Sequence, residues 1–190
     1  MHSIRPATRE DAQAILDIYS PYIDTTSLTF ETDQPSLESF AERITNYLHL
    51  WPWLVYEQDG IIAGYAYGSR YRERTGYQWC VETSVYVKEN LQRKGIATQL
   101  YRSLMTILQL QGYRNVYAVV NLPNEKSIRL HEACGFTYLT TYQNVGYKLG
   151  QWKHVGWWQL QLNDYSHDPA PPTAFSALPA EAVSALLTNK

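Results

Sequence analysis

The stretch from residue 77 to residue 120 constrains the fold more than any other part of the chain. An alternating strand pattern, YQWCVETSVYV, runs from 77 to 87, and the glycine turn NLQRKGIATQL follows at 90–100. An apolar helical stripe then ends at Gly112, a natural left-handed cap position, and residues 116–120 are all apolar. A helical crossover joins neighbouring strands, so residues 116–120 are predicted to form a strand that is buried on both faces.

The rest of the pattern predicts a mixed sheet flanked by helices. Residues 4–7 form a strand candidate, Thr8 and Ser36 begin helices, and Asp59-Gly60 marks a hairpin. After the crossover, a helix that starts at Asn124 or Ser127 closes at Gly135, and two strands follow around 136–142 and 155–162. The predicted order is βααβββαβαββ, an α/β (α+β) fold in one domain, residues 1–163.

Composition shifts at residue 164, and residues 164–190 are predicted to be a Pro-rich tail. In this segment Ala180, Val183, Leu186 and Leu187 line one face of a short helix, which would dock onto a partner subunit. A frayed terminus is the alternative.

Charge and cysteine content exclude several classes of function. The 16 basic and 18 acidic residues nearly balance, which predicts neither a nucleic-acid surface nor a membrane surface. The two cysteines, Cys80 and Cys134, form no C-x-x-C pair, and no histidine cluster has metal-ligand spacing. We interpret both as free thiols of a reducing compartment. Charged residues interrupt the first twenty positions, which leaves no apolar signal core, so a cytoplasmic protein is expected. The cysteine and histidine spacing predicts that no metal is bound.

The glycine turn is a candidate anion site. It lies where a strand ends and a helix begins, so successive backbone N–H groups have no partner within the helix. Gly95 would let the backbone approach a phosphate closely, and Arg93 and Lys94 add positive charge to the helix dipole. A solvated helix start without a ligand is the alternative reading of these residues alone.

The turn resembles the Q/R-x-x-G-x-G/A pyrophosphate loop of the GNAT acetyltransferases, and the predicted order of elements is similar to theirs. The segments YQWCVETSVYV, QRKGIATQLY, VVNLPNEKSIRLHEACGF and HVGWWQLQL resemble the phosphinothricin N-acetyltransferase type, over about residues 2–163. The resemblance implies acetyl-CoA as the donor, a small amino-acid-like amine as the acceptor and a homodimer.

The resemblance also implies how the donor is held. The main chain of three strand residues would pair with the pantetheine arm, and one of its N–H groups would stabilise the oxyanion. Asn124 would hydrogen-bond the same arm. The three strand residues are Val85, Tyr86 and Val87, and the residues that would bind the pyrophosphate are Arg93, Lys94, Gly95, Ile96, Ala97 and Thr98.

Two residues are candidates for proton transfer. Glu82 matches the family's V-E-[ST] position and would act as the base that removes a proton from the acceptor ammonium. A lone strand glutamate would otherwise face solvent. His131 occupies the helix position at which many GNAT enzymes carry a tyrosine that protonates the leaving thiolate. It would either take that role or simply cap the helix or pack under the CoA.

Acceptor recognition is predicted from two short segments. Arg74 and Tyr77 in RERTGYQW match the family's R-x-x-Y, and the guanidinium would clamp a carboxylate or phosphinate. Residues 29–31 resemble the family's T-F-E substrate loop and would close over the same space. The predicted substrate-binding residues are Phe30, Glu31, Arg74, Thr75, Gly76 and Tyr77.

The chain also departs from the family pattern. Tyr71 stands where several members have tryptophan, and Lys153, followed by His154, replaces a histidine that has an active-site part in some relatives. The acceptors expected are phosphinothricin, methionine sulfoximine or methionine sulfone. The alternatives are an aminoglycoside, a polyamine, a protein N-terminus, or a non-catalytic acyl-CoA sensor.

Overall fold

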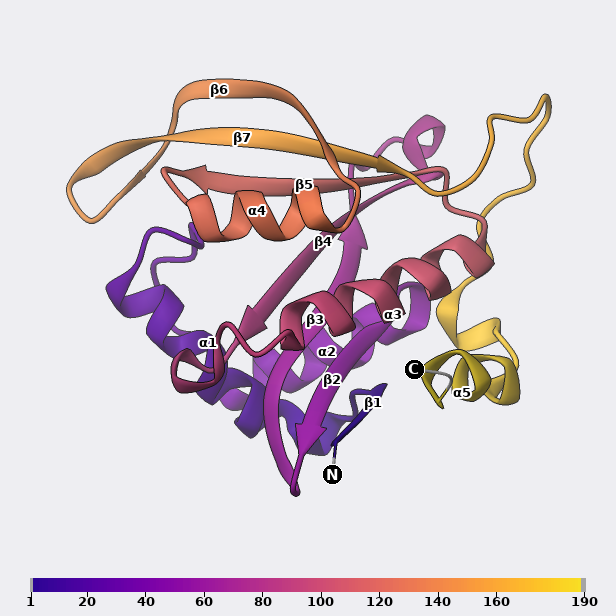
Figure 1. The fold of residues 1–190 in the computed structure, drawn as a ribbon, viewed down its shortest axis with the longest axis horizontal. Helices are drawn as coiled ribbons and strands as arrows, with labels where there is room; N and C mark the ends of the chain where they lie inside the picture. Colours follow the sequence, from indigo (N-terminus) through magenta and orange to yellow (C-terminus); the bar gives the residue numbers. More distant parts are fainter. Residues whose placement is uncertain (1, 189–190) are drawn as a thin grey trace.

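The protein is built on one seven-stranded mixed sheet (Figure 1), and the structure, a computed structural model, describes residues 2–188. The strand order across the sheet is β1-β2-β3-β4-β5-β7-β6, and only β4 and β5 run parallel. The strands are β1 His2–Pro6, β2 Trp53–Gln58, β3 Ile61–Arg70, β4 Cys80–Val87, β5 Asn115–Leu122, β6 Thr137–Lys148 and β7 Gln151–Gln161. The mixed sheet confirms the predicted fold class.

Helices cover both faces of the sheet. One face packs against α1 and α2 through a core that includes Phe40, Trp53 and Tyr65, and the other packs against α3 and α4. Ser36 caps α2 and Gly112 ends α3 in the left-handed conformation, both as predicted. The helices are α1 Ala12–Thr25, α2 Leu37–Leu50, α3 Ile96–Gln111, α4 Glu125–Ala133 and α5 Ala180–Thr188.

The two parallel strands separate part of the way along their length. β4 pairs with β5 only over Cys80–Thr83 and Asn115–Ala118, whereas both strands continue for four more residues. Figure 1 shows the two strands diverging beyond the paired part, with the start of α3 on the side of β4 and α4 beneath β5. Main-chain groups on the facing edges of the separated parts are therefore free of sheet pairing between these two strands.

Three sequence predictions about the strands need correction. β4 begins at Cys80, because Thr75–Tyr77 form a 3-10 turn and the Trp79 indole donates to the Ala170 carbonyl (2.9 Å). β6 and β7 extend well beyond the predicted ranges and form a long hairpin. β5 is not buried on both faces, since Val119 is 41% exposed. That open face belongs to the candidate site.

The C-terminal segment packs on its own chain, which contradicts the alternative of a frayed terminus, whereas docking of its helix onto a partner subunit stays a prediction. The Gln111 amide donates to the carbonyls of Leu50 (2.8 Å) and Thr173 (2.7 Å), and Val183 of α5 is buried against the main core. α5 contacts α3 and β1. Residues 189 and 190 of the predicted tail lie outside the described residues. Within 2–188, none of the helices has the length and apolarity needed to cross a bilayer.

Candidate active site

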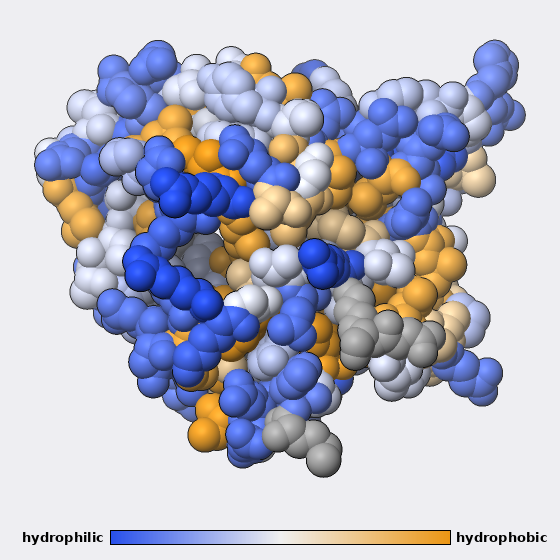
Figure 2. All heavy atoms as spheres, viewed as in Figure 1, coloured by the Kyte–Doolittle hydropathy of each residue, from blue (hydrophilic) through white to orange (hydrophobic). Residues whose placement is uncertain are grey.

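A cleft of about 1080 Å³ opens between the diverging strands. Its walls come from α1, the separated part of β4, the glycine turn, the end of β5 and α4. Figure 2 shows a hollow on this face of the molecule with hydrophilic residues around its rim. The lining includes these predicted donor-binding and catalytic residues: Val85, Tyr86, Val87, Arg93, Gly95, Ile96, Ala97, Thr98, Asn124 and His131.

The glycine turn has the backbone geometry of an anion site. Gly95 is the N-cap of α3 in the left-handed conformation (φ 80°), and Arg93 also has a positive φ of 63°. Left-handed residues beside a helix start orient consecutive N–H groups in one direction, as in anion-binding nests. A strained non-glycine residue here is typical of functional loops. Lys94 lies in the same turn, although it is not among the residues that line the cleft.

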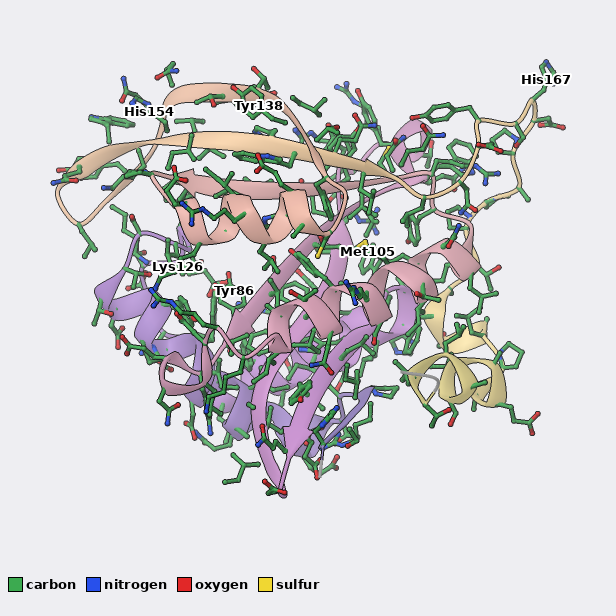
Figure 3. The ribbon with its side chains drawn as sticks, viewed as in Figure 1. Tyr86, Met105, Lys126, Tyr138, His154 and His167 are labelled. Atoms are coloured by element: carbon green, nitrogen blue, oxygen red, sulfur yellow. The ribbon has the colours of Figure 1, made fainter. Side chains whose placement is uncertain are left out.

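A chain of hydrogen-bonded polar side chains lines the cleft. The Tyr22 hydroxyl donates to the Val87 carbonyl (2.7 Å), and the Gln92 amide donates to that hydroxyl (3.1 Å). The Gln92 oxygen in turn accepts from the Lys126 ammonium (3.5 Å). Figure 3 shows Lys126 and Tyr86 near each other, between α4 and the start of α3. Sequence reasoning missed Tyr22 and Lys126, because nothing in the local pattern distinguishes them from other helix residues.

The cleft residues fit a CoA thioester on structural grounds. The unpaired strand edges can bond an extended amide-containing arm, and Thr83, the last β4 residue paired with β5, lines the cleft. Asn124 caps α4, its side-chain oxygen accepting from the Ser127 N–H (3.2 Å). This bond occupies only the oxygen, so the amide N–H groups stay available to a ligand.

His131 is a neutral imidazole with a defined tautomer. It is buried, and Nδ1 lies 2.7 Å from the Ser127 carbonyl oxygen, which can only accept. Nδ1 therefore carries the proton, and Nε2 accepts from the Tyr101 hydroxyl (2.9 Å). Burial lowers the pKa of His131 to about 4. Since Nε2 has no proton to give, this arrangement favours the packing alternative over a role as the acid.

Glu82 has the properties of a general base. It lies on β4 in the last part that is paired with β5, opposite Tyr117, and its side chain is 27% exposed. Burial raises the pKa of the carboxyl to about 7, and Arg72 opposes this rise from 3.5 Å away. A base whose pKa lies close to neutrality is well matched to proton transfer at physiological pH.

Aromatic side chains form a wall beside Glu82. The Tyr71 and Tyr117 rings stack at 4.4 Å, and Trp157 meets Tyr71 edge to face at 6.2 Å. The Arg72 guanidinium lies over Tyr71 (4.4 Å) and Trp157 (5.4 Å). The buried Trp157 N–H has no hydrogen-bond acceptor among the described residues. We call these five residues, Glu82 included, the acceptor face. The sequence analysis named Glu82 as the base and Tyr71 as a departure from the family pattern, and it missed the other three.

The predicted acceptor-binding segments lie at opposite ends of β5, which corrects the expectation that they close over the same space. The connection that carries Arg74, Thr75, Gly76 and Tyr77 reaches the start of β5, since the Trp79 carbonyl accepts from the Asn115 N–H (3.3 Å). The 27–31 loop reaches the end of β5, where Asn121 donates to the Ser27 carbonyl. Six strand residues span about 20 Å. Glu82 lies between the two segments.

Arg74 and Arg72 differ in their surroundings. Arg74 is exposed at the N-cap of the 3-10 turn, and its guanidinium has no partner among residues 2–188, whereas Arg72 lies against Glu82. A charged residue two positions from the predicted one was therefore missed. Lys153 donates to Gln151 (2.8 Å), and the His154 ring accepts from the Asn144 N–H (3.0 Å), so both are engaged within the β6–β7 hairpin.

Comparison with known proteins agrees with this geometry. Residues 4–157 match the model of the acetyltransferase (GNAT) domain. A phosphinothricin N-acetyltransferase of Streptomyces viridochromogenes is 41% identical over 169 residues, which are 89% of this chain and 90% of that protein. An L-methionine sulfoximine/L-methionine sulfone acetyltransferase of Salmonella typhimurium is 32% identical over 86% of this chain and 96% of its own.

A solved structure shares the whole architecture. The phosphinothricin acetyltransferase of Sinorhizobium meliloti, a GNAT protein in complex with acetyl-CoA, superposes with a TM-score of 0.84 at 29% identity. The match covers 92% of this chain and 98% of that one. The chain therefore belongs to the GNAT acetyltransferase family and is an acetyl-CoA-dependent N-acetyltransferase.

Proposed function

We propose that the acceptor is a small amino acid with a second polar or anionic group, of the phosphinothricin, methionine sulfoximine or methionine sulfone type. Glu82, half-buried at the fork of β4 and β5 beside a cationic and aromatic wall, is the observation that carries this proposal. Relatives that act on these compounds support it. Acetyl-CoA supplies the activated acetyl group.

Each step of the proposed reaction has a candidate group. Glu82 removes a proton from the acceptor ammonium, and the free amine attacks the thioester carbonyl. The tetrahedral intermediate then breaks its C–S bond, and the CoA thiolate takes up the proton that the new amide nitrogen loses and leaves as the thiol. A main-chain N–H among residues 85–87 stabilises the oxyanion, and the turn at residues 93–98 binds the pyrophosphate. The His131 imidazole holds Tyr101 in place at the wall of the cleft. Arg74 binds the anionic group of the acceptor.

A panel of acceptors tests the proposed substrate class. Release of CoA thiol is measured with phosphinothricin, methionine sulfoximine and methionine sulfone, and with a polyamine, an aminoglycoside and an N-terminal peptide. We expect the first three to have the highest kcat/KM. A polyamine or aminoglycoside as the best acceptor would overturn the substrate class. No thiol release with any amine, together with tight acetyl-CoA binding, would support a sensor.

We further propose that the protein is a homodimer that functions in the cytoplasm. Long apolar side chains on the β6–β7 hairpin are exposed, Trp152 by 63%, Leu149 by 59% and Tyr147 by 57%. A patch of this kind suits an interface between identical subunits. Two free cysteines, Cys80 and Cys134, fit a reducing compartment. Light scattering after gel filtration of wild type and Trp152→Glu tests the dimer, and a monomeric wild type would contradict it.

A further inference from the structure

Lys148, near the end of β6, is a buried lysine that the proposed reaction does not use. It is only 5% exposed, and its ammonium donates to the Thr29 carbonyl (2.9 Å) and lies 3.5 Å from the Tyr22 carbonyl. Burying an ammonium costs free energy unless its donors are satisfied, and a methionine would fill the space without that cost. The buried ammonium is therefore better explained by its contacts with the Thr29 and Tyr22 carbonyls than by a contribution to the free energy of unfolding.

Strand β6 makes a second contact with the 27–31 loop, which contains Thr29. The Phe30 ring occupies the space over Gly146, so that any side chain at position 146 would overlap the ring. Gly146 and Lys148 lie two residues apart on β6 and so face the same side of the sheet. The β6–β7 hairpin thus contacts two consecutive residues of the loop, the Thr29 main chain and the Phe30 ring.

Other bonds hold the remaining loop residues. Asn121 at the end of β5 donates to the Ser27 carbonyl, and the Tyr19 and Thr29 hydroxyls lie 2.7 Å apart. Arg43 of α2 pairs with Glu31 (2.7 Å). The loop also borders the cleft, whose lining includes Leu28 and Asn121. Four elements therefore determine one loop conformation at the rim of the cleft.

We propose that Lys148 is a positioning residue, which clamps the 27–31 loop onto the β6–β7 hairpin and thereby sets acceptor affinity. The proposal rests on the proposed function, and it adds that the 27–31 loop, whose Leu28 lines the cleft, borders the acceptor. Lys148 itself acts through the loop main chain. Its removal should release the loop without changing the glycine turn that binds the donor.

The variant Lys148→Met tests the clamp with two measurements. Acceptor KM is expected to rise about tenfold or more, the scale of losing a charged hydrogen bond, while KM for acetyl-CoA stays within about twofold. Amide hydrogen exchange in residues 26–31, measured without any acceptor, should become about tenfold faster. Lys148→Arg retains a cationic donor and is expected to restore part of the protection.

Two further variants control the result. Gln143→Met places the same side chain on an exposed position of β6 and should change neither measurement. Gly146→Ala displaces the Phe30 ring without touching Lys148 and should raise acceptor KM in the same direction. Wild-type acetyl-CoA affinity in each variant shows that the fold is retained.

Unchanged exchange at 26–31 in Lys148→Met, or an acceptor KM within twofold of wild type, would overturn the clamp. The proposed function fails separately, when wild type acetylates none of the amino-acid analogues. The exchange measurement still decides the clamp in that case, because it needs no acceptor.

Discussion

The cleft between the separated parts of β4 and β5, which we call the donor cleft, adjoins the acceptor face along β4, but the two are built from different parts of the chain. The donor cleft relies on main-chain geometry in nearly continuous segments, the separated edge of β4 and the left-handed Gly95 at the start of α3. The acceptor face relies on side chains from the β3–β4 connection, β4, β5 and β7. Donor binding should therefore respond to backbone changes, and acceptor chemistry to single side-chain changes.

Glu82→Gln should have the largest effect and separate the two regions most clearly. The amide cannot accept the proton, so kcat should fall by about 10²–10⁴-fold while the Kd for acetyl-CoA stays unchanged. In wild type kcat/KM should rise as pH increases through about 7, because the carboxyl must lose its proton to act. This rise of kcat/KM with pH should be absent in Glu82→Gln. Normal turnover by Glu82→Gln would place the base elsewhere.

Arg74→Ala tests whether one exposed guanidinium recognises the acceptor. We expect a loss of about 2–4 kcal/mol in kcat/KM for phosphinate or sulfoximine acceptors, with little change in KM for acetyl-CoA. Equal loss for all amines would contradict the assignment.

Arg72→Ala is the matched comparison, since Arg72 contacts Glu82 and Arg74 does not. Removing this cation should raise the pKa of Glu82. The rise of kcat/KM with pH should therefore move to higher pH by up to about 0.7 of a pH unit. If Arg72→Ala instead shows the selective loss expected of Arg74→Ala, Arg72 is the residue that binds the acceptor anion.

Gly95→Val tests the donor side through the backbone alone. A β-branched residue at φ 80° is strained, and its side chain would stand where a phosphate approaches. We expect the Kd for acetyl-CoA to rise by about tenfold or more, by isothermal titration, with the pH profile of remaining activity unchanged. An unchanged Kd would show that the pyrophosphate binds elsewhere.

The smallest effect is expected for His131→Gln. If the imidazole only holds Tyr101, kcat should fall less than about tenfold, whereas loss of a general acid costs about 10²–10⁴-fold. Thermal unfolding of the variant separates lost packing from lost chemistry. A decrease in kcat beyond a hundredfold at unchanged stability would restore the acid role.

The sequence determined the order of elements and most of the donor cleft, because these depend on local signals. Gly95 and Gly112 need left-handed backbone, Ser36 and Asn124 cap helices, and a crossover places β4 beside β5. The cleft follows from these local features plus the divergence of two strands.

Only the tertiary structure decided the acceptor face, the state of His131 and the buried Lys148. Tyr71, Tyr117 and Trp157 are far apart in sequence and meet through the pairing of β5 with β4 and β7. The alternating pattern that predicted a strand from residue 77 is equally compatible with a turn fixed by long-range bonds at Trp79. The alternating pattern of one strand predicts which of its side chains lie on the same face of the sheet. Which strands are neighbours, and so which side chains meet in the acceptor face, depends on the pairing of strands far apart in the sequence.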